Sequence, residues 1–209
     1  MPTFSARQIV PVALLVLVMA SLLTASPMPG DVVLDFEGFP DFTSLTNQYP
    51  GVTFVDATVI STSLDDAEFP PHSGVSVVFD NGGPISIIFS QPVVVVGGYF
   101  TYTTQVTFTA FYGITQVAST QSAFNNNLAI SGDPGSAPNE NLQLGNPGGI
   151  TEATATGDPA GTSFVLDDLY YQPAQLSSVP EPGTLFLAVS GIGLILFCFY
   201  RSRRAEVRR

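Results

Sequence analysis

The sequence predicts an all-β protein, an antiparallel β-sandwich of jelly-roll type, with a signal helix before it and a transmembrane sorting helix after it in a chain of 209 residues. Short runs of β-branched and aromatic residues alternate with clusters of Gly, Pro, Asn and Asp, which is typical of short strands joined by local turns. Between the two ends, no stretch of ten residues shows the period of an amphipathic helix. A β-barrel is the alternative architecture.

Nine runs have the composition of strands. They cover residues 32–36, 52–60, 75–79, 85–89, 93–102, 105–112, 114–120, 150–156 and 163–171. A turn is expected at 80–84, where Asp, Asn, Gly and Pro separate two apolar runs. The pair Gly97-Gly98 predicts a β-bulge. Residues 121–149, rich in Asn, Pro and Gly, predict a surface loop with one short strand around Leu142.

Residues 1–25 have the layout of a secretory signal peptide. Arg7 precedes an uncharged apolar run over residues 9–23, and small residues follow it. A positive start, an apolar middle and small residues at the cleavage point are the features that a signal peptidase recognises. We expect cleavage after Ala25, with Ala20 as the second choice. An uncleaved membrane anchor or a buried core helix is the alternative.

The other end predicts a helix that crosses a membrane. Residues 183–200 carry no charge, and as a helix they would be about 27 Å long, enough for the hydrocarbon core of a bilayer. We expect the transmembrane helix itself over residues 184–200. Arg201, Arg203 and Arg204 follow at once, and basic residues stay on the cytoplasmic side. The chain before the helix is therefore expected on the far side of the inner membrane.

Pro180, Glu181 and Pro182 stand immediately before this helix. Pro-Glu-Pro, a short apolar helix and an Arg-rich tail, in that order over residues 179–209, resemble the PEP-CTERM sorting signal of Gram-negative bacteria. The resemblance implies processing by an exosortase and an association with exopolysaccharide and biofilm. It also implies an exported protein that is transiently anchored in the membrane and then lies at the cell surface or outside the cell.

The middle of the chain is strongly acidic. Of the 17 acidic residues, all but Glu181 and Glu206 lie within residues 31–179, which contain no Lys or Arg, so this block has a formal charge of −15. Such a surface repels phosphate backbones, which excludes nucleic-acid binding. The single cysteine, Cys198, lies in the C-terminal segment. The acidic β-sandwich, expected over residues 31–175, therefore has no disulfide and depends on core packing or a bound ion.

Three short segments, residues 34–38, 71–74 and 164–169, are similar to the β-sandwich domains of PEP-CTERM proteins and, more loosely, to galactose-binding-like jelly rolls. That similarity implies first and last strands that lie close together and supply ligands to a structural calcium ion.

Strand alternation puts one acid of Asp167-Asp168 on the core side, where a carboxylate needs a partner and no base is available. Ca²⁺ prefers hard oxygen ligands, so we expect a site formed by Asp35, Glu37, Asp167 and Asp168. A carboxylate bonded to backbone amides is an equally good alternative.

No catalytic motif accompanies His72, the only histidine. Ser73 is its neighbour in sequence, which is usually the wrong geometry for a nucleophile and its base, and we expect a turn residue and no enzyme. The expected function is a structural or interaction role in the exopolysaccharide matrix. A carbohydrate-binding module is the alternative. An exposed row of aromatic side chains that includes Tyr99, Tyr102, Tyr112 and Tyr171 would favour it. A hydrolase, favoured by a convergent His, Ser and Asp set, is the remote third possibility.

Overall fold

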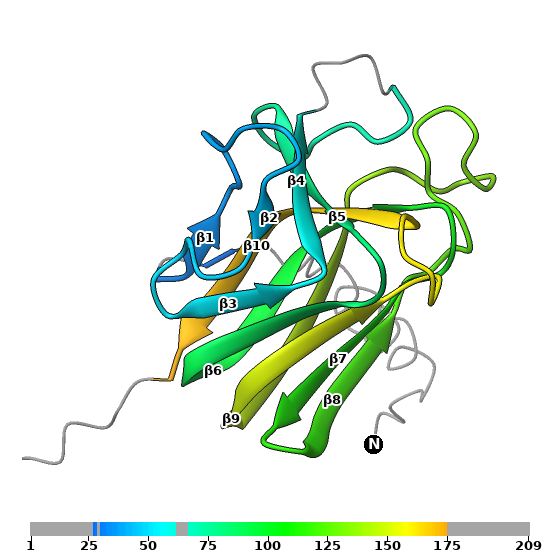
Figure 1. The fold of residues 1–209 in the computed structure, drawn as a ribbon. Helices are drawn as coiled ribbons and strands as arrows, with labels where there is room; N and C mark the ends of the chain where they lie inside the picture. The colour runs from blue at the N-terminus through cyan, green and yellow to red at the C-terminus, as the bar shows by residue number, and fades with distance from the viewer. Residues whose placement is uncertain (1–26, 29, 62–66, 175–209) are drawn as a thin grey trace, which may run out of the picture. The chain divides into compact units, whose positions relative to one another are not determined.

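The computed structural model describes residues 27–28, 30–61 and 67–174, and every strand pairing in this part is antiparallel. The fold is an all-β sandwich without a described helix (Figure 1). Its strands are β1 Val32–Leu34, β2 Ser44–Leu45, β3 Val52–Val55, β4 Ala57–Ser61, β5 Ser76–Asp80, β6 Ile85–Tyr102, β7 Thr107–Tyr112, β8 Thr115–Gln121, β9 Glu140–Thr156 and β10 Phe164–Pro173.

The strands follow the order β2-β4-β5-β10-β6-β9-β7-β8, with β1 added to β10 and β3 added to β6. The longest strand, β6, changes its partner halfway: its edge pairs with β3 over residues 86–89 and with β10 from residue 93 onward. Two groups of strands therefore diverge from β6. One apolar core joins them, and its largest side chains include Phe36, Phe54, Phe100, Phe108 and Phe164.

Strand alternation decides which side chains enter this core. In the first half of β6, Ile85, Ile87 and Phe89 are buried, whereas the residues between them belong to the opposite face. On that opposite face the register places Ser86, Thr154, Thr109 and Ser119 side by side across β6, β9, β7 and β8. We call these four residues the hydroxyl row. Ser86 and Thr154 lie 3.4 Å apart through their hydroxyl oxygens, and Thr109 and Ser119 lie 3.1 Å apart.

The last strand, β10, occupies the interior of the sheet and is buried over most of its length. One edge pairs with β6, and the other edge is shared: β5 pairs with Val165 and Leu166, and β1 pairs with residues 169–171. The predicted closeness of first and last strands is thus present. Between the two partners lies a β-bulge at Asp167 and Asp168, and Asp168 has a positive φ of 43°.

Several strand predictions need correction. The run 52–60 forms two strands, β3 and β4, because Asp56 adopts a φ of 56° between them. The runs 85–89 and 93–102 form one strand of 18 residues. The short strand expected around Leu142 is present, but it is longer than expected: it is the start of β9, which begins at Glu140, pairs with β6 along residues 140–145 and continues to Thr156.

The predicted bulge at Gly97-Gly98 lies on the neighbouring strand instead. Asp167 pairs with Tyr99 and Tyr170 pairs with Gly97, so the extra residue belongs to β10. The glycines are needed for another reason. A Cβ at Gly97 would come within 2.5 Å of the Tyr170 ring, and a Cβ at Gly98 would come within 2.5 Å of Leu166. An aromatic side chain that covers a glycine on the adjacent strand stabilises such a site.

The part of residues 121–149 that remains a loop is anchored to the end of β6 by Asn127, which is fully buried. Its side-chain oxygen accepts a hydrogen bond from Tyr102 N at 2.7 Å, and its amide group donates to Phe100 O and Ala137 O. Glu68 holds the same loop from outside by accepting from Ile130 N and Ser131 N. The Asn127 side chain thus satisfies main-chain groups at the end of β6 that a neighbouring strand would otherwise satisfy.

The predicted signal peptide at 1–25, the predicted transmembrane helix at 184–200 and the residues around Pro180 lie outside the described residues. Within the part of the chain that the structure describes, no helix is long and apolar enough to cross a membrane.

Asp80 joins the end of β5 to the turn before β10. Its carboxylate is fully buried and accepts hydrogen bonds from Ser163 N, Ser163 Oγ and Phe164 N at 2.8–3.1 Å. Burial raises its pKa, and the hydrogen bonds from Phe164 and Ser163 only partly oppose this effect. A raised pKa in the folded state means that folding takes up a proton, so this carboxylate contributes stability at low pH that is lost as the pH rises through the folded pKa.

We therefore predict that Asp80→Ala lowers the free energy of unfolding by roughly 2–4 kcal/mol, because it leaves two buried N–H groups without an acceptor. Asp80→Asn keeps one acceptor oxygen and should cost less. Urea unfolding at pH 7 and pH 4 measures both effects. When the pH is lowered from 7 to 4, toward the ordinary pKa of an aspartate at 3.8, the stability of the wild type should rise relative to that of Asp80→Asn, and an equal change in the two proteins would contradict the assignment.

Candidate functional site

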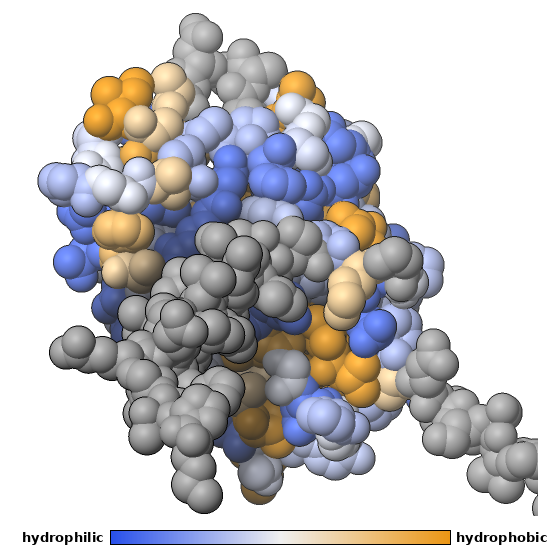
Figure 2. Space-filling view, turned by 180° about the vertical axis from the view of Figure 1, so that it is seen from behind, coloured by the Kyte–Doolittle hydropathy of each residue, from blue (hydrophilic) through white to orange (hydrophobic). Residues whose placement is uncertain are grey.

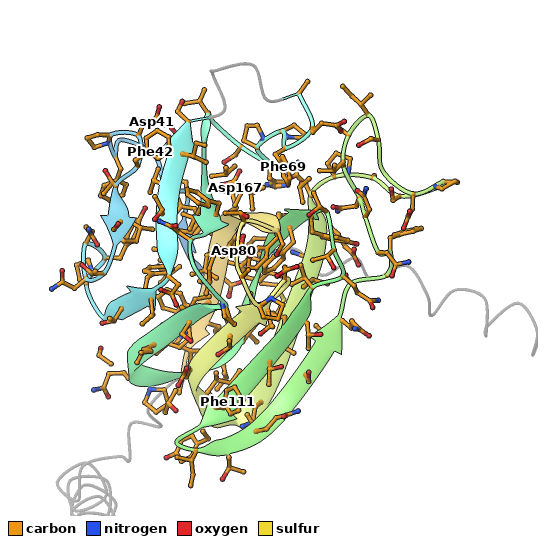
Figure 3. The ribbon with its side chains drawn as sticks, turned by 45° about the vertical axis from the view of Figure 1, so that its right-hand side comes forward. Asp41, Phe42, Phe69, Asp80, Phe111 and Asp167 are labelled. Carbon is orange, nitrogen blue, oxygen red and sulfur yellow. The ribbon has the colours of Figure 1, made fainter. Side chains whose placement is uncertain are left out.

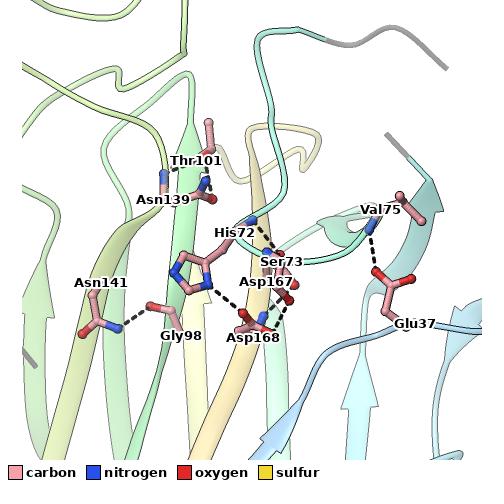
Figure 4. A network of polar contacts seen from close by, with 10 residues as sticks. All are labelled: Glu37, His72, Ser73, Val75, Gly98, Thr101, Asn139, Asn141, Asp167 and Asp168. Carbon is pink, nitrogen blue, oxygen red and sulfur yellow. Dashed lines mark hydrogen bonds and ion pairs between the residues drawn. The ribbon is translucent and has the colours of Figure 1, made fainter. Parts of the chain in front are cut away.

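A group of ionisable, hydroxyl and aromatic side chains lies together at the β10 bulge. His72 and Ser73, from the loop before β5, lie against Asp167 and Asp168, and Tyr99 from β6 lies beside them. We call these five residues the His72 cluster, and Figure 4 shows all of them except Tyr99. Figure 3 shows Asp167 near the middle of the molecule, whereas Phe111 lies near the end of β7. The cluster forms because the bulge opens a gap between β1 and β5 that this loop fills.

Asp167 is the structural centre of the cluster and is 1% exposed. Its Oδ2 accepts hydrogen bonds from His72 N at 2.7 Å and Ser73 N at 2.9 Å, and its Oδ1 accepts from Asp168 N at 2.7 Å. Burial raises the pKa of Asp167 to about 6, with a further contribution from the charge of Asp168, and the amide donors oppose the rise. Three main-chain N–H groups therefore stabilise a carboxylate that has no Lys or Arg within reach.

Asp168 binds the two side chains of the loop. Its Oδ2 lies 2.6 Å from His72 Nδ1, and its Oδ1 accepts a hydrogen bond from Ser73 Oγ at 2.9 Å. A histidine, a serine and an aspartate thus converge, as a hydrolase would require. Their order is wrong for catalysis, however: the serine hydroxyl donates to the carboxylate and not to the imidazole. Activation of a serine needs a hydroxyl that donates to a base held by the acid.

His72 is also fixed by an aromatic ring. The imidazole stacks on Tyr99 with ring centroids 3.5 Å apart and an angle of 7° between the planes. Its side chain remains 37% exposed. With Nδ1 at Asp168 and one face on Tyr99, the imidazole holds the loop onto β6 and β10, which agrees with the turn role expected from the sequence.

The four predicted calcium ligands do not form one site. Glu37 Oε1 accepts hydrogen bonds from Val75 N at 2.7 Å and Ser76 N at 2.8 Å, on the other end of the segment that Asp167 and Asp168 hold. Asp35 accepts from the N–H of Glu37. In the described ranges, no group of three or more His, Cys, Asp or Glu side chains is arranged to hold a metal ion. The backbone-amide alternative describes the observed contacts of Asp167.

Sequence reasoning missed how the loop and the bulge fit together. Asp167 and Asp168 stand out in the sequence because two acids in an apolar run without any base demand partners. Their actual partners, the N–H groups of residues 72 and 73, carry no sequence signal, since every residue except proline has an N–H. The only available signal was His72 itself, because it is the sole potential cation in the acidic block.

The aromatic residues do not form an exposed row. Tyr102 is fully buried, Tyr99 is covered by His72, and Tyr171 packs against Phe89 with ring centroids 5.2 Å apart. Tyr112 is 50% exposed. Seen from the side opposite to Figure 1, apolar residues lie in separate patches among hydrophilic ones (Figure 2).

Two surface hollows lie elsewhere. One, of about 350 Å³, is lined by residues of β2, β3 and β4, including Asp56 and Asn81. The other, of about 430 Å³, is lined by residues 103–104 and 158–163. No residue of the His72 cluster lines either hollow.

The match to a known protein-sorting motif lies at the C-terminal end of the chain. Residues 178–204 match the PEP-CTERM protein-sorting motif. The motif marks an exported protein that is targeted to exosortase and is transiently anchored in the membrane through this C-terminal signal. No curated protein matches the chain.

Two solved structures resemble the domain weakly. The K2 cleaved adhesin domain of Lys-gingipain is 14% identical, with a TM-score of 0.44, over 68% of this chain and 99% of that chain. A family 11 carbohydrate-binding module from Clostridium thermocellum, in complex with a β-1,3-1,4-mixed-linked tetrasaccharide, is 10% identical, with a TM-score of 0.34, over 71% of this chain and 98% of that chain. At these values neither likeness says what this chain binds.

The calcium ion stays a prediction, and unfolding experiments can test it. If Ca²⁺ binds near Asp168, it should raise the thermal midpoint of EDTA-treated protein, since a ligand that binds only the folded state stabilises it. Asp168→Asn should abolish that rise, and Asp133→Asn, a change of the same charge in a distant loop, should preserve it. Equal midpoints in Ca²⁺ and EDTA would leave the hydrogen bonds from the loop, from main-chain N–H groups to Asp167 and from His72 and Ser73 to Asp168, as the stabilisers of these acids.

Proposed function

We propose that the mature protein is a non-catalytic structural or interaction component of the bacterial exopolysaccharide matrix. The observation that carries this proposal is the sorting motif at residues 178–204, which sends the chain out of the cell. The domain that is delivered has a packed core and acidic residues held by main-chain N–H groups. These are the properties of a stable module and not of a mobile catalytic site.

The His72 cluster supports the non-catalytic part of the proposal. Ser73 Oγ donates to Asp168, and Asp167 is occupied by three amide donors, so the cluster holds neither an activated hydroxyl nor a carboxylate free for acid–base work. Glycosidases need two carboxylates facing each other across a cleft. The acids of this cluster instead face the loop that they hold.

A carbohydrate-binding module is the second candidate, and Tyr112 is the observation in its favour. An exposed aromatic ring can stack on a sugar ring. Tyr112 stands alone in this respect among the tyrosines singled out from the sequence, because Tyr99, Tyr102 and Tyr171 are covered or buried. We therefore rank this candidate below the structural role.

Processing at both ends is the first test. Mass spectrometry of the exported protein should show loss of about 25 N-terminal residues and of the helix after Pro182. Replacing Pro180 and Pro182 by Ala should leave the protein in the membrane fraction, whereas Ser177→Ala should not. Peptides spanning Arg201 to Arg209 recovered from the cell exterior would contradict exosortase processing.

The matrix role is tested by deletion. A strain without this protein should show altered aggregation or matrix retention, and re-expression should restore both. Re-expression of His72→Ala should restore them too if the mutant protein is folded, because no catalytic step is involved, and purified protein should hydrolyse neither glycosides nor esters. Hydrolysis that His72→Ala abolishes would establish the enzyme instead. Binding to a glycan that Tyr112→Ala abolishes would establish the carbohydrate-binding module.

A further inference from the structure

We propose that two copies of this protein pair through the free edge of β8 and form a twofold dimer with one continuous sheet. This inference concerns self-association and is independent of the matrix role. In the described residues β8 pairs only with β7 and ends the strand order, so it lies at the outer edge of the sheet (Figure 1). Alternate N–H and C=O groups of such an edge have no strand partner.

The edge lacks most of the features that prevent edge-to-edge pairing. Native edges are commonly very short, charged, interrupted by proline or covered. At the other end of the sheet, β2 has two residues, whereas β8 has seven, and its sequence Thr-Gln-Val-Ala-Ser-Thr-Gln contains neither charge nor proline. One protective feature is present, a bulge at Val117, which limits the regular edge to residues 118–121. The proposed contact is therefore short.

Electrostatics select this edge over other surfaces. Two domains with a formal charge of −15 repel each other across most of their surfaces. Residues 81–132, which include all of β6, β7 and β8, contain no Asp, Glu, Lys, Arg or His. Two acidic residues of β9 lie on this side of the sheet order: Glu152 is two strands away from the edge, and Glu140 accepts a hydrogen bond from Ala123 N, beyond the end of β8. A second copy can approach β8 without bringing carboxylates together at the contact.

The hydroxyl row sets the register. It crosses β6, β9 and β7 and ends at Ser119, which is exposed at the edge. An antiparallel pair centred on Ser119 places Ser119 of the second copy directly opposite, so the row continues across the twofold axis. Paired hydroxyls on opposite strands hydrogen-bond, as Thr109 and Ser119 do at 3.1 Å, and such pairs stabilise sheets.

The test uses the exported protein, with Cys198→Ser as background so that an unprocessed chain carries no native cysteine. Analytical ultracentrifugation should show a monomer–dimer equilibrium, and Ser119→Glu should weaken dimerisation about fivefold or more, because it places like charges opposite each other. Thr53→Glu is the matched control: it adds the same charge at an exposed position of β3 and should leave the dimer intact. Circular dichroism checks that each variant is folded.

A cross-link provides the second measurement. Residues opposite each other in an antiparallel pair lie about 4.5–5.5 Å apart through their Cα atoms, within disulfide range. Ser119→Cys should therefore form a linked dimer on mild oxidation, and Thr53→Cys should not. A protein that stays monomeric at millimolar concentration, a dimer that survives Ser119→Glu without forming the Ser119→Cys link, or open-ended filaments would each overturn the proposal.

Discussion

The absence of Lys and Arg between residues 31 and 179 constrains the whole domain. Apart from Asp168, which lies against His72, a carboxylate drawn into such a fold has no basic side chain to pair with, so the main chain must stabilise it. Asp80, Asp167, Glu37 and Glu68 each accept hydrogen bonds from two or more N–H groups of a distant segment. Every one of these acids fixes a loop or a strand end, so the acidic residues determine how the connections between strands fold.

This constraint explains why the His72 cluster resembles a catalytic site without the connectivity of one. Asp167 is placed where β1 and β5 separate along β10, and the N–H groups of the loop before β5 close the gap. His72 and Ser73 come to Asp168 as part of the same closure. The convergence of His, Ser and Asp thus follows from holding a loop in an acidic domain, and the hydroxyl is bonded to the acid for the same reason.

The sequence was informative where side-chain pattern decides structure, and less so where the main chain decides it. Short β-branched and aromatic runs separated by turn residues predicted the sandwich, and Pro180-Glu181-Pro182 with its flanking residues predicted the sorting motif. The strand around Leu142 was expected, but its continuity with the strand at 150–156 was not, because Asn141 and Gly145 disfavour strands locally while pairing with β6 outweighs that preference. The sequence also placed Glu37 and Asp167 in one site, whereas each binds a different pair of main-chain N–H groups. Nearly every residue has such a group, so the sequence does not indicate which ones a carboxylate will bind.

The pairing of β1 with β10 gives the domain a mechanical property. Val32 lies opposite Tyr171, so the chain enters the domain beside the point where it leaves. A pull applied through Ala174 along the chain acts on β10, which is bonded to β6 on one edge and to β1 and β5 on the other. The stretch that leads out of the domain is therefore bonded along both of its edges, and it can leave the sheet only if its pairing with β6 and its pairing with β1 and β5 are both lost.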